Sequence, residues 1–396
     1  MASYTANLAH ALADLGVQVA VVADRVEGDP ARFDDGSVEV HRTFDLGPAA
    51  LPTAARGARA LGASVVHLQF ELFLYGGAHS LPGLFPALAS LRRPGDSAPL
   101  VTTMHQVVDP AEIDRAYTRL HRVQAPAVVA RRGMAAVQSA IGRASARVVV
   151  HEEPFKTAVA DATVIPHGIE ARRSTGRAEA RRALGVDPDR FVVLCFGFLA
   201  PYKGLEVVLD AAGLVPSHVE VVVAGGEHPR LVGETSFGAG LRECYGQVAR
   251  FTGWVPDADV SRWFAAADVA LFPYPKPFSS SGALALALSL GTPVLLSPAL
   301  ARCAGAPSAT AVALEPRALA HRLGELSRHP DEARRAGALV GGARRRSLVV
   351  GGRRPARPSL RGGLRMTVSA RWLRPRTPSS SGSLAVARPT GHELRS

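Results

Sequence analysis

Lysine and cysteine are scarce in this chain of 396 residues. Three lysines stand against 43 arginines, and the three cysteines, Cys195, Cys244 and Cys303, are scattered without the spacing of a metal site. We therefore expect structural thiols in a reducing cytosol. The sequence also has no basic and apolar leader with a small-residue cleavage site. We accordingly predict a cytoplasmic protein rather than a secreted one.

A long apolar run is missing as well. The uncharged stretch of suitable length lies between Lys276 and Arg302, and serines, glycines and prolines interrupt it. A helix that crosses a bilayer needs about 20 mostly apolar residues. We predict no such helix here.

The net charge of +12 has a single origin. Residues 341–396 contain 13 arginines, no lysine and one acid, Glu393, whereas the remaining 340 residues hold 33 basic and 33 acidic side chains. The tail is rich in Gly, Pro and Ser, has no helical or strand period, and contains Trp372 as its sole aromatic residue. This composition predicts a disordered basic tail on an electrically balanced body.

Short β-branched runs alternate with helical patterns along that body. The expected strands lie at 17–23, 64–70, 98–105, 146–151 and 162–170, and then at 191–198, 219–226, 268–274 and 292–297. Such alternation predicts an α/β fold with doubly wound parallel sheets, and the break near residue 167 predicts two of them. We predict two Rossmann-like domains, 1–166 and 167–340, that face a cleft, followed by the tail at 341–396. The cleft is the expected ligand site.

The stretch PYPKPFSSSGALALALSLGTPVL, residues 273–295, places serines before a short apolar helix. Serine is a preferred helix N-cap, and Gly291 fits the position just past a helix C-terminus. The free N–H groups at a helix start attract anions, of which phosphate is the common one. We therefore expect an anionic ligand near residues 279–282.

A second turn, in FGFLAPYKGLEVVLDAA (residues 196–212), carries Lys203 between a strand and an amphipathic helix. A compact ammonium at such a turn suits a phosphate as a point charge. The ordinary alternative is a solvated surface lysine. The glycines that flank the turn, Gly197 and Gly204, favour the functional interpretation.

A third turn lies in FTGWVPDADVSRWFAAADVALFPY, residues 251–274. Backbone groups at 253–255 could read the edge of a nucleobase. Phe251, Trp254 and Trp263, taken by themselves, rather indicate packing in a core or between domains.

Together these segments form an ordered set of motifs. They are FGFLAPYKG, VVVAGG, FTGWVPD with AAADVALFPY, and SGALALALSLGTPV, preceded by SYTANLAHALADLGVQVAVV, VVHLQFELFLYGG, VTTMH and VIPHGIE. In this order, over roughly residues 2–340, they resemble the GT-B glycosyltransferases of family 4. The resemblance implies transfer of a sugar from a nucleotide-sugar donor to an acceptor, usually with retention and without a metal or another cofactor. It places the donor on the C-terminal domain and the acceptor on the N-terminal one.

The resemblance also implies where the donor binds. Lys203 matches a lysine that contacts the donor diphosphate, beside the Gly197 turn. The loop and helix start next to the phosphates and the donor sugar match Ser279, Ser280, Ser281 and Gly282. The turn that contacts the base matches Gly253, Trp254 and Val255.

His105, in TTMH, matches a cleft-facing histidine that contacts the donor sugar or the acceptor, and it is our catalytic candidate. A satisfied structural histidine at a strand end is an alternative of about equal weight. We expect His67 and His167 to be mainly structural.

The sequence departs from the family pattern at three donor positions. Phe198 stands where an arginine usually follows the turn glycine, and two glutamates that lie eight residues apart fall at Phe278 and Leu286. A missing hydrogen bond to a charged group costs roughly 1.5–3 kcal/mol. The serine loop is then expected to hold the donor through N–H and hydroxyl groups, and the usual pattern does not identify the sugar or the base.

Both ends depart as well. The chain opens on a helix, whereas the family begins with a central strand and a glycine-rich loop, so we expect the first strand of the N-terminal domain to be missing. The tail stands where the family has a helix that packs back on that domain. We expect a wrongly chosen start codon and a frameshift, which the coding DNA would test.

Other functions remain as alternatives. The first is a catalytically inactive relative that binds a sugar nucleotide or a partner, favoured by the missing arginine and glutamates. The second is a binder of nucleic acid or anionic membranes through the tail, which lacks lysine and interleaved aromatics. We expect no nucleic-acid partner and leave open a peripheral membrane contact and an acceptor that is a carbohydrate, a lipid or a small molecule. An NAD-dependent dehydrogenase is disfavoured because no G-x-G-x-x-G follows a strand.

Overall fold

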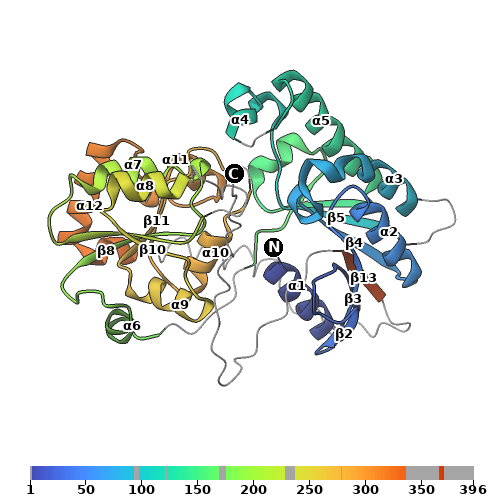
Figure 1. Cartoon of the computed structure of the whole chain (residues 1–396), viewed down its shortest axis with the longest axis horizontal. Helices are drawn as coiled ribbons and strands as arrows, with labels where there is room; N and C mark the ends of the chain where they lie inside the picture. Colours follow the sequence, from blue (N-terminus) through green and yellow to red (C-terminus); the bar gives the residue numbers. More distant parts are fainter. Residues whose placement is uncertain are drawn as a thin grey trace, which may run out of the picture.

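The structure is a computed structural model that describes residues 2–92, 98–120, 123–168, 175–227, 237–277, 279–335 and 365–369. The described residues form an eight-stranded and a five-stranded sheet, which lie in separate halves of the molecule (Figure 1). Both sheets are parallel except for one edge strand of the larger sheet. The predicted α/β fold with two Rossmann-like domains is therefore confirmed. We call the half with the larger sheet the N-terminal domain and the other half the C-terminal domain.

The N-terminal domain contains most elements up to residue 164. In chain order these are α1 (Ala2–Asp14), β1 (Gln18–Asp24), β2 (Arg32–Asp35), β3 (Val38–Phe44), α2 (Ala50–Ala60), β4 (Val65–Phe70), α3 (Leu81–Leu91), β5 (Leu100–Met104), α4 (Arg115–Leu120), α5 (Ala127–Ala144), β6 (Arg147–Val150) and β7 (Thr163–Val164). The sequence patterns did not predict β2 and β3. In β3 buried and half-buried residues alternate, because this strand lies near the edge, between β1 and the antiparallel β2.

A strand from the tail completes this sheet. The order is β2-β3-β1-β13-β4-β5-β6-β7, and β13 (Arg365–Ser369) pairs in parallel with β1 on one side and β4 on the other (Figure 1). The prediction of disorder is therefore wrong for residues 365–369, and the position expected to lack a strand is filled. The Arg/Gly/Pro composition of this segment did not indicate a strand. The strand is stabilised by backbone partners in β1 and β4, which lie far away in the sequence. The other residues of the predicted tail lie outside the described residues.

The C-terminal domain follows the same layout. Its elements are α6 (Arg177–Leu184), β8 (Phe191–Phe196), α7 (Leu205–Ala212), β9 (Val219–Ala224), α8 (Phe237–Tyr245), β10 (Arg250–Gly253), α9 (Asp257–Ala266), β11 (Val269–Phe272), α10 (Gly282–Ser289), β12 (Val294–Leu296), α11 (Pro298–Cys303) and α12 (Pro316–Arg328). The strand order is β10-β9-β8-β11-β12, all parallel. One core lies under α7 and α12, and a second lies under α9 and α10. All carboxyl ends of these strands therefore share one edge.

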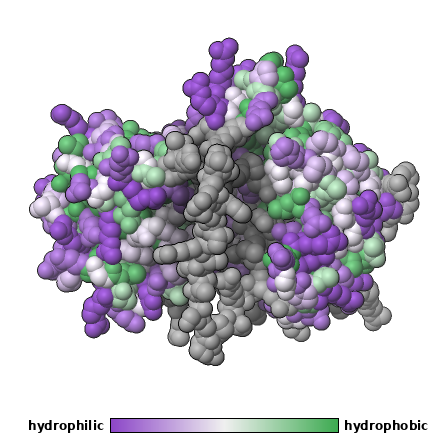
Figure 2. All heavy atoms as spheres, in the orientation of Figure 1, coloured by the Kyte–Doolittle hydropathy of each residue, from purple (hydrophilic) through white to green (hydrophobic). Residues whose placement is uncertain are grey.

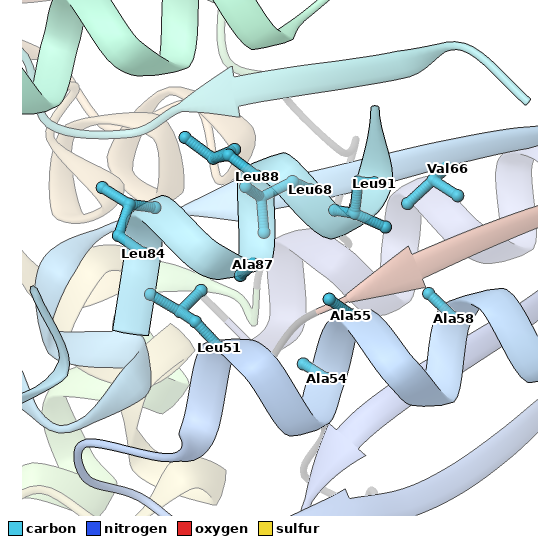
Figure 3. A pocket seen from close by; sticks show the side chains of 10 residues that line it. All are labelled: Leu51, Ala54, Ala55, Ala58, Val66, Leu68, Leu84, Ala87, Leu88 and Leu91. Carbon is cyan, nitrogen blue, oxygen red and sulfur yellow. The ribbon is translucent and has the colours of Figure 1, made fainter. Parts of the chain in front are cut away.

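A small hollow lies in the N-terminal core between α2, α3 and β4 (Figure 3). Its volume is about 20 Å³, and it is lined by alanine, leucine and valine side chains such as Leu51, Leu84 and Val66. This is about the space of one water molecule, and an apolar hollow of that kind stays dry. It is therefore a packing void rather than a ligand site.

The outward faces of both domains carry many hydrophilic side chains with hydrophobic ones scattered between them (Figure 2). Within the described ranges, no helix combines the length and the apolar character that crossing a bilayer requires.

Candidate functional site

The donor candidates of the C-terminal domain lie along the carboxyl edge of its sheet. Gly197 follows β8 with a φ of 115°, a conformation that favours glycine. A Cβ atom at Gly197 would lie 2.6 Å from Nζ of Lys203. The glycine thus gives the ammonium room to lie directly against the backbone at the end of β8.

Lys203 ends the short helix Pro201–Lys203 and is only 9% exposed. Its ammonium lies 5.7 Å from the centroid of the Tyr274 ring. Burial lowers the pKa of Lys203, since the charged form loses hydration. The side chains that act on this pKa are those of Tyr202 and Cys195, and no carboxylate is among them. A buried ammonium without a carboxylate beside it is the kind of group that an anion stabilises.

The serine loop, residues 279–281, lies beside Tyr274. Ser281 is the N-cap of α10, and its Oγ accepts a hydrogen bond of 3.1 Å from the Leu284 N–H. The same hydroxyl lies 3.5 Å from the Tyr274 hydroxyl. Gly291 follows the helix with a φ of 74°. The predicted cap and stop of this helix are confirmed, and Tyr274 connects its start to Lys203.

The predicted base-contacting turn has one prominent side chain. Gly253 ends β10, Val255 is buried in the core, and Trp254 is 67% exposed. The ring of Trp254 lies 6.0 Å from that of Phe198, which is itself 37% exposed. The alternative that Trp254 packs in a core is wrong, whereas Trp263 is 5% exposed and belongs to the core.

The same loop touches the N-terminal domain. Ser279 forms an isolated antiparallel bridge with Gln106, the residue after His105. Ser280 donates a hydrogen bond of 2.8 Å from Oγ to Oε1 of Glu152. The two carboxyl edges therefore meet at the serine loop on one side and at β5 and β6 on the other.

His105 follows β5 and is 3% exposed, so it is buried beneath the edge rather than open to solvent. Both of its ring nitrogens have partners. Nε2 lies 2.7 Å from Oε1 of Gln69, and Nδ1 lies 3.1 Å from Nε2 of His151. His151 Nδ1 in turn lies 2.8 Å from the Ile165 carbonyl oxygen.

Two acceptors fix protons at the ends of this row. The Ile165 carbonyl oxygen only accepts, so His151 Nδ1 carries a proton. Gln69 Oε1 also only accepts, so His105 Nε2 carries a proton in the amide orientation of the structure.

Burial favours the neutral rings of His105 and His67. It lowers the pKa of His105 well below the usual value, and the neighbouring His151 lowers it further. His67, 2.8 Å from the Thr103 hydroxyl and 3.1 Å from the Gln69 amide, has a pKa lowered to about 4 by burial. A mainly structural role for His67 stays a prediction.

Tyr4 of α1 covers this histidine row. Its ring centroid lies 4.8 Å from that of His105, 5.2 Å from that of His151 and 4.9 Å from that of His167. Burial raises the pKa of Tyr4 to about 12.

Sequence reasoning missed Tyr4, Gln69, His151 and Glu152. The available signal was that Gln69, His105 and His151 each lie at the carboxyl end of an expected strand.

The histidines do not form a metal site. In the parts of the chain that the structure describes, no group of three or more His, Cys, Asp and Glu side chains is arranged to hold a metal ion.

Two family models match the two domains. Residues 1–173 match the model described as Glycosyltransferase Family 4, and residues 190–329 match the model described as Glycosyl transferases group 1. The chain belongs to the GT-B glycosyltransferases.

Curated relatives of this GT-B glycosyltransferase include enzymes named D-inositol 3-phosphate glycosyltransferase. The one from Mycobacterium marinum is 34% identical over 131 residues, which are 32% of this chain and 27% of that protein. The match thus spans about a quarter of that relative's length. The one from Thermobispora bispora is 28% identical over 388 residues, 88% of this chain and 85% of that protein.

Solved structures share the GT-B fold. Sucrose-phosphate synthase from Thermosynechococcus elongatus has a TM-score of 0.67 and 19% identity over 88% of this chain and 91% of that one. Anabaena HepE in complex with UDP and glucose has a TM-score of 0.60 and 18% identity over 85% of this chain and 96% of that one.

Proposed function

We propose that this chain transfers a sugar from a nucleoside-diphosphate-sugar donor to an acceptor, with the donor on the C-terminal domain. The alignment of groups along one sheet edge carries the proposal. From β10 to α10 it contains an exposed indole at Trp254, the buried ammonium of Lys203 and the N-terminus of an eight-residue helix. A nucleoside diphosphate sugar offers complementary groups in the same order, namely an aromatic base, two phosphates and a sugar.

Each group has a physical role in donor binding. Aromatic side chains stack on bases for about 1–3 kcal/mol per base. The Lys203 ammonium and the Gly282 end of α10 both favour negative charge, and together they face a diphosphate from two sides. Ser279 and Ser280 offer hydroxyls to phosphate or sugar when they leave the N-terminal domain.

The reaction follows from these roles. The bond between the anomeric carbon and the diphosphate oxygen breaks, the nucleoside diphosphate leaves with the electron pair, and an acceptor oxygen forms the new bond and gives up its proton. The ammonium and the helix end stabilise the charge that develops on the leaving diphosphate. In a metal-dependent transferase a divalent cation stabilises this charge. Here the ammonium and the helix end take that role, so we propose a metal-independent transfer. Retention of configuration is proposed from the family resemblance.

Titration calorimetry with UDP, GDP, ADP and TDP tests the donor site on the full chain. Lys203→Met is expected to weaken binding of the preferred diphosphate by about 10- to 150-fold, the equivalent of roughly 1.5–3 kcal/mol for a charge-assisted hydrogen bond. Lys156→Met is the matched control, because Lys156 is a half-exposed lysine of the N-terminal domain. Equal affinities in all three proteins contradict the proposal.

A turnover assay separates transfer from binding alone. The names of the similar proteins make UDP-glucose the first donor and D-inositol 3-phosphate the first acceptor to try. Release of the nucleoside diphosphate that depends on an acceptor supports a transferase. Lys203-dependent binding without any release, across sugar donors and acceptors, instead supports the inactive sugar-nucleotide-binding relative.

A further inference from the structure

The fourth position of the N-terminal sheet is occupied by a strand that comes from almost 300 residues further along the chain than its neighbour β4. Val21 and His67 both pair with Val368, and Ala20 and Val66 both pair with Thr367. Neighbouring strands lie about 4.8 Å apart, so β1 and β4 are roughly 9–10 Å from each other and cannot bond directly. Together they form a slot for one parallel strand.

The side chains of residues 365–369 fit the slot. Val368 is 0% exposed, lies opposite Val21 of β1 and belongs to the same hydrophobic cluster as Val21 and Val40. Thr367 is also 0% exposed, while Arg365 at the strand start lies 3.4 Å from the Glu39 carboxylate. The helix α2 crosses β13, which is the faint red arrow beside Ala55 and Ala58 in Figure 3. Small residues on α2 allow this close approach.

An empty slot would be costly for the whole sheet. The inward backbone groups of β1 and β4 would lose their partners beneath α2, and each buried orphan group costs about as much as a lost hydrogen bond. The hydrophobic cluster around Val21 would lose Val368. Parallel sheets are covered on both faces, so such an interior gap cannot simply be solvated.

We propose that the slot between β1 and β4 is a strand-binding site whose occupant is residues 365–369 of the same chain, and that the N-terminal domain folds only with this strand in place. The 29 residues between Arg335 and Arg365 can span up to about 100 Å, so the strand reaches the slot from the C-terminal domain. Occupancy also fixes β4, which carries Gln69 and through it His105. The strand-binding site does not depend on what the C-terminal domain binds.

Hydrogen exchange on the full chain tests the occupant directly. The amides of residues 366–368 are expected to exchange as slowly as those of β1 and β4, because they lie between two ladders. Exchange at the rate of an unprotected amide overturns the proposal. Size-exclusion chromatography with light scattering is expected to give a monomer, and a dimer that exchanges this strand overturns its assignment to the same chain.

Two substitutions test the fit. Val368→Asp places a carboxylate in the sheet interior and is expected to abolish the folded N-terminal domain, whereas Val128→Asp, at a valine that is 54% exposed, is the control. The Thr367 hydroxyl is buried without a partner among the described residues, so Thr367→Val is expected to raise Tm by about 2–4 °C. An unchanged or lower Tm for Thr367→Val, or a folded Val368→Asp protein with native exchange, overturns the proposal.

Discussion

Ser280 of the C-terminal domain donates a hydrogen bond of 2.8 Å from Oγ to Oε1 of Glu152 in the N-terminal domain. The bridge between Ser279 and Gln106 lies next to it, so the serine loop holds the two domains together. The Ser280 hydroxyl of this contact is also one that we propose for the donor. Under that proposal, donor binding and the domain contact compete for it.

The first prediction concerns this contact. Ser280→Asp places a carboxylate against Glu152, and two like charges 4 Å apart repel by about 1–4 kcal/mol between bulk water and a near-surface environment. We expect the ligand-free domains to separate, which small-angle X-ray scattering detects as a larger radius of gyration. Ser280→Asp combined with Glu152→Gln is the control, since it removes the repulsion and restores a hydrogen bond. An unchanged radius for Ser280→Asp would show that the contact does not hold the domains.

The second prediction concerns the histidine pair. His151 Nε2 lies 3.1 Å from His105 Nδ1, so His151→Ala leaves this buried ring nitrogen of His105 without its partner. Such a loss costs about 1–3 kcal/mol, and we expect kcat for transfer to fall roughly 10- to 100-fold with little change in the KM of the donor. His151→Gln keeps a hydrogen-bonding amide and is expected to recover most of kcat. Equal defects in both variants, or an effect on KM alone, would assign His151 a merely structural role.

The third prediction is that removing the charge of Lys203 changes protein stability and diphosphate binding in opposite directions. Its ammonium is buried against Gly197 and the Tyr274 ring, and burial lowers its pKa. Lys203→Met removes the buried charge and keeps an apolar stem of similar length, so Tm of the ligand-free protein should rise while diphosphate binding falls. Differential scanning fluorimetry with and without the nucleotide measures both. A variant that loses stability as well as binding would mean that the ammonium supports the fold rather than an anion.

The sequence predicts much of this architecture because the signals are local. The strand β8 and the Ser281 cap of α10 follow from apolar runs and from helix-end chemistry within a few residues. The features that the sequence did not predict depend on residues that lie far apart in the chain. β13 is a five-residue segment in an Arg/Gly/Pro context that becomes a strand because β1 and β4 leave a slot. For Trp254 the resemblance predicted a base-contacting turn and the residue alone indicated packing, and its side chain lies exposed beside Phe198.

The histidine row was missed for the same reason. His105 was identified by its motif, but its partners Gln69 and His151 lie 36 and 46 residues away in sequence, and they meet it because parallel strands end at one edge. His105 was expected to face the cleft, whereas in the structure its side chain is buried. A sequence pattern gives the end of a strand without showing what covers it, and here Tyr4 covers it.

The last prediction is the pH dependence of the N-terminal domain. His67 on β4 faces the Thr103 hydroxyl and the Gln69 amide, and its pKa is about 4 in the folded protein against 6.5 for an ordinary histidine. The unfolded chain therefore binds more protons than the folded one between these values, so stability falls as the pH falls from 6.5 toward 4. At pH 5 the loss from His67 alone is on the order of 2 kcal/mol, and the lowered pKa of His105 acts in the same direction.

Urea unfolding of the full chain at pH 7 and pH 5 measures this loss. His67→Gln is the matched variant, since its amide can still bond Thr103 but takes up no proton, and its stability is expected to change less between the two pH values. If wild type and His67→Gln lose the same stability on acidification, His67 is not buried in neutral form and the prediction is wrong.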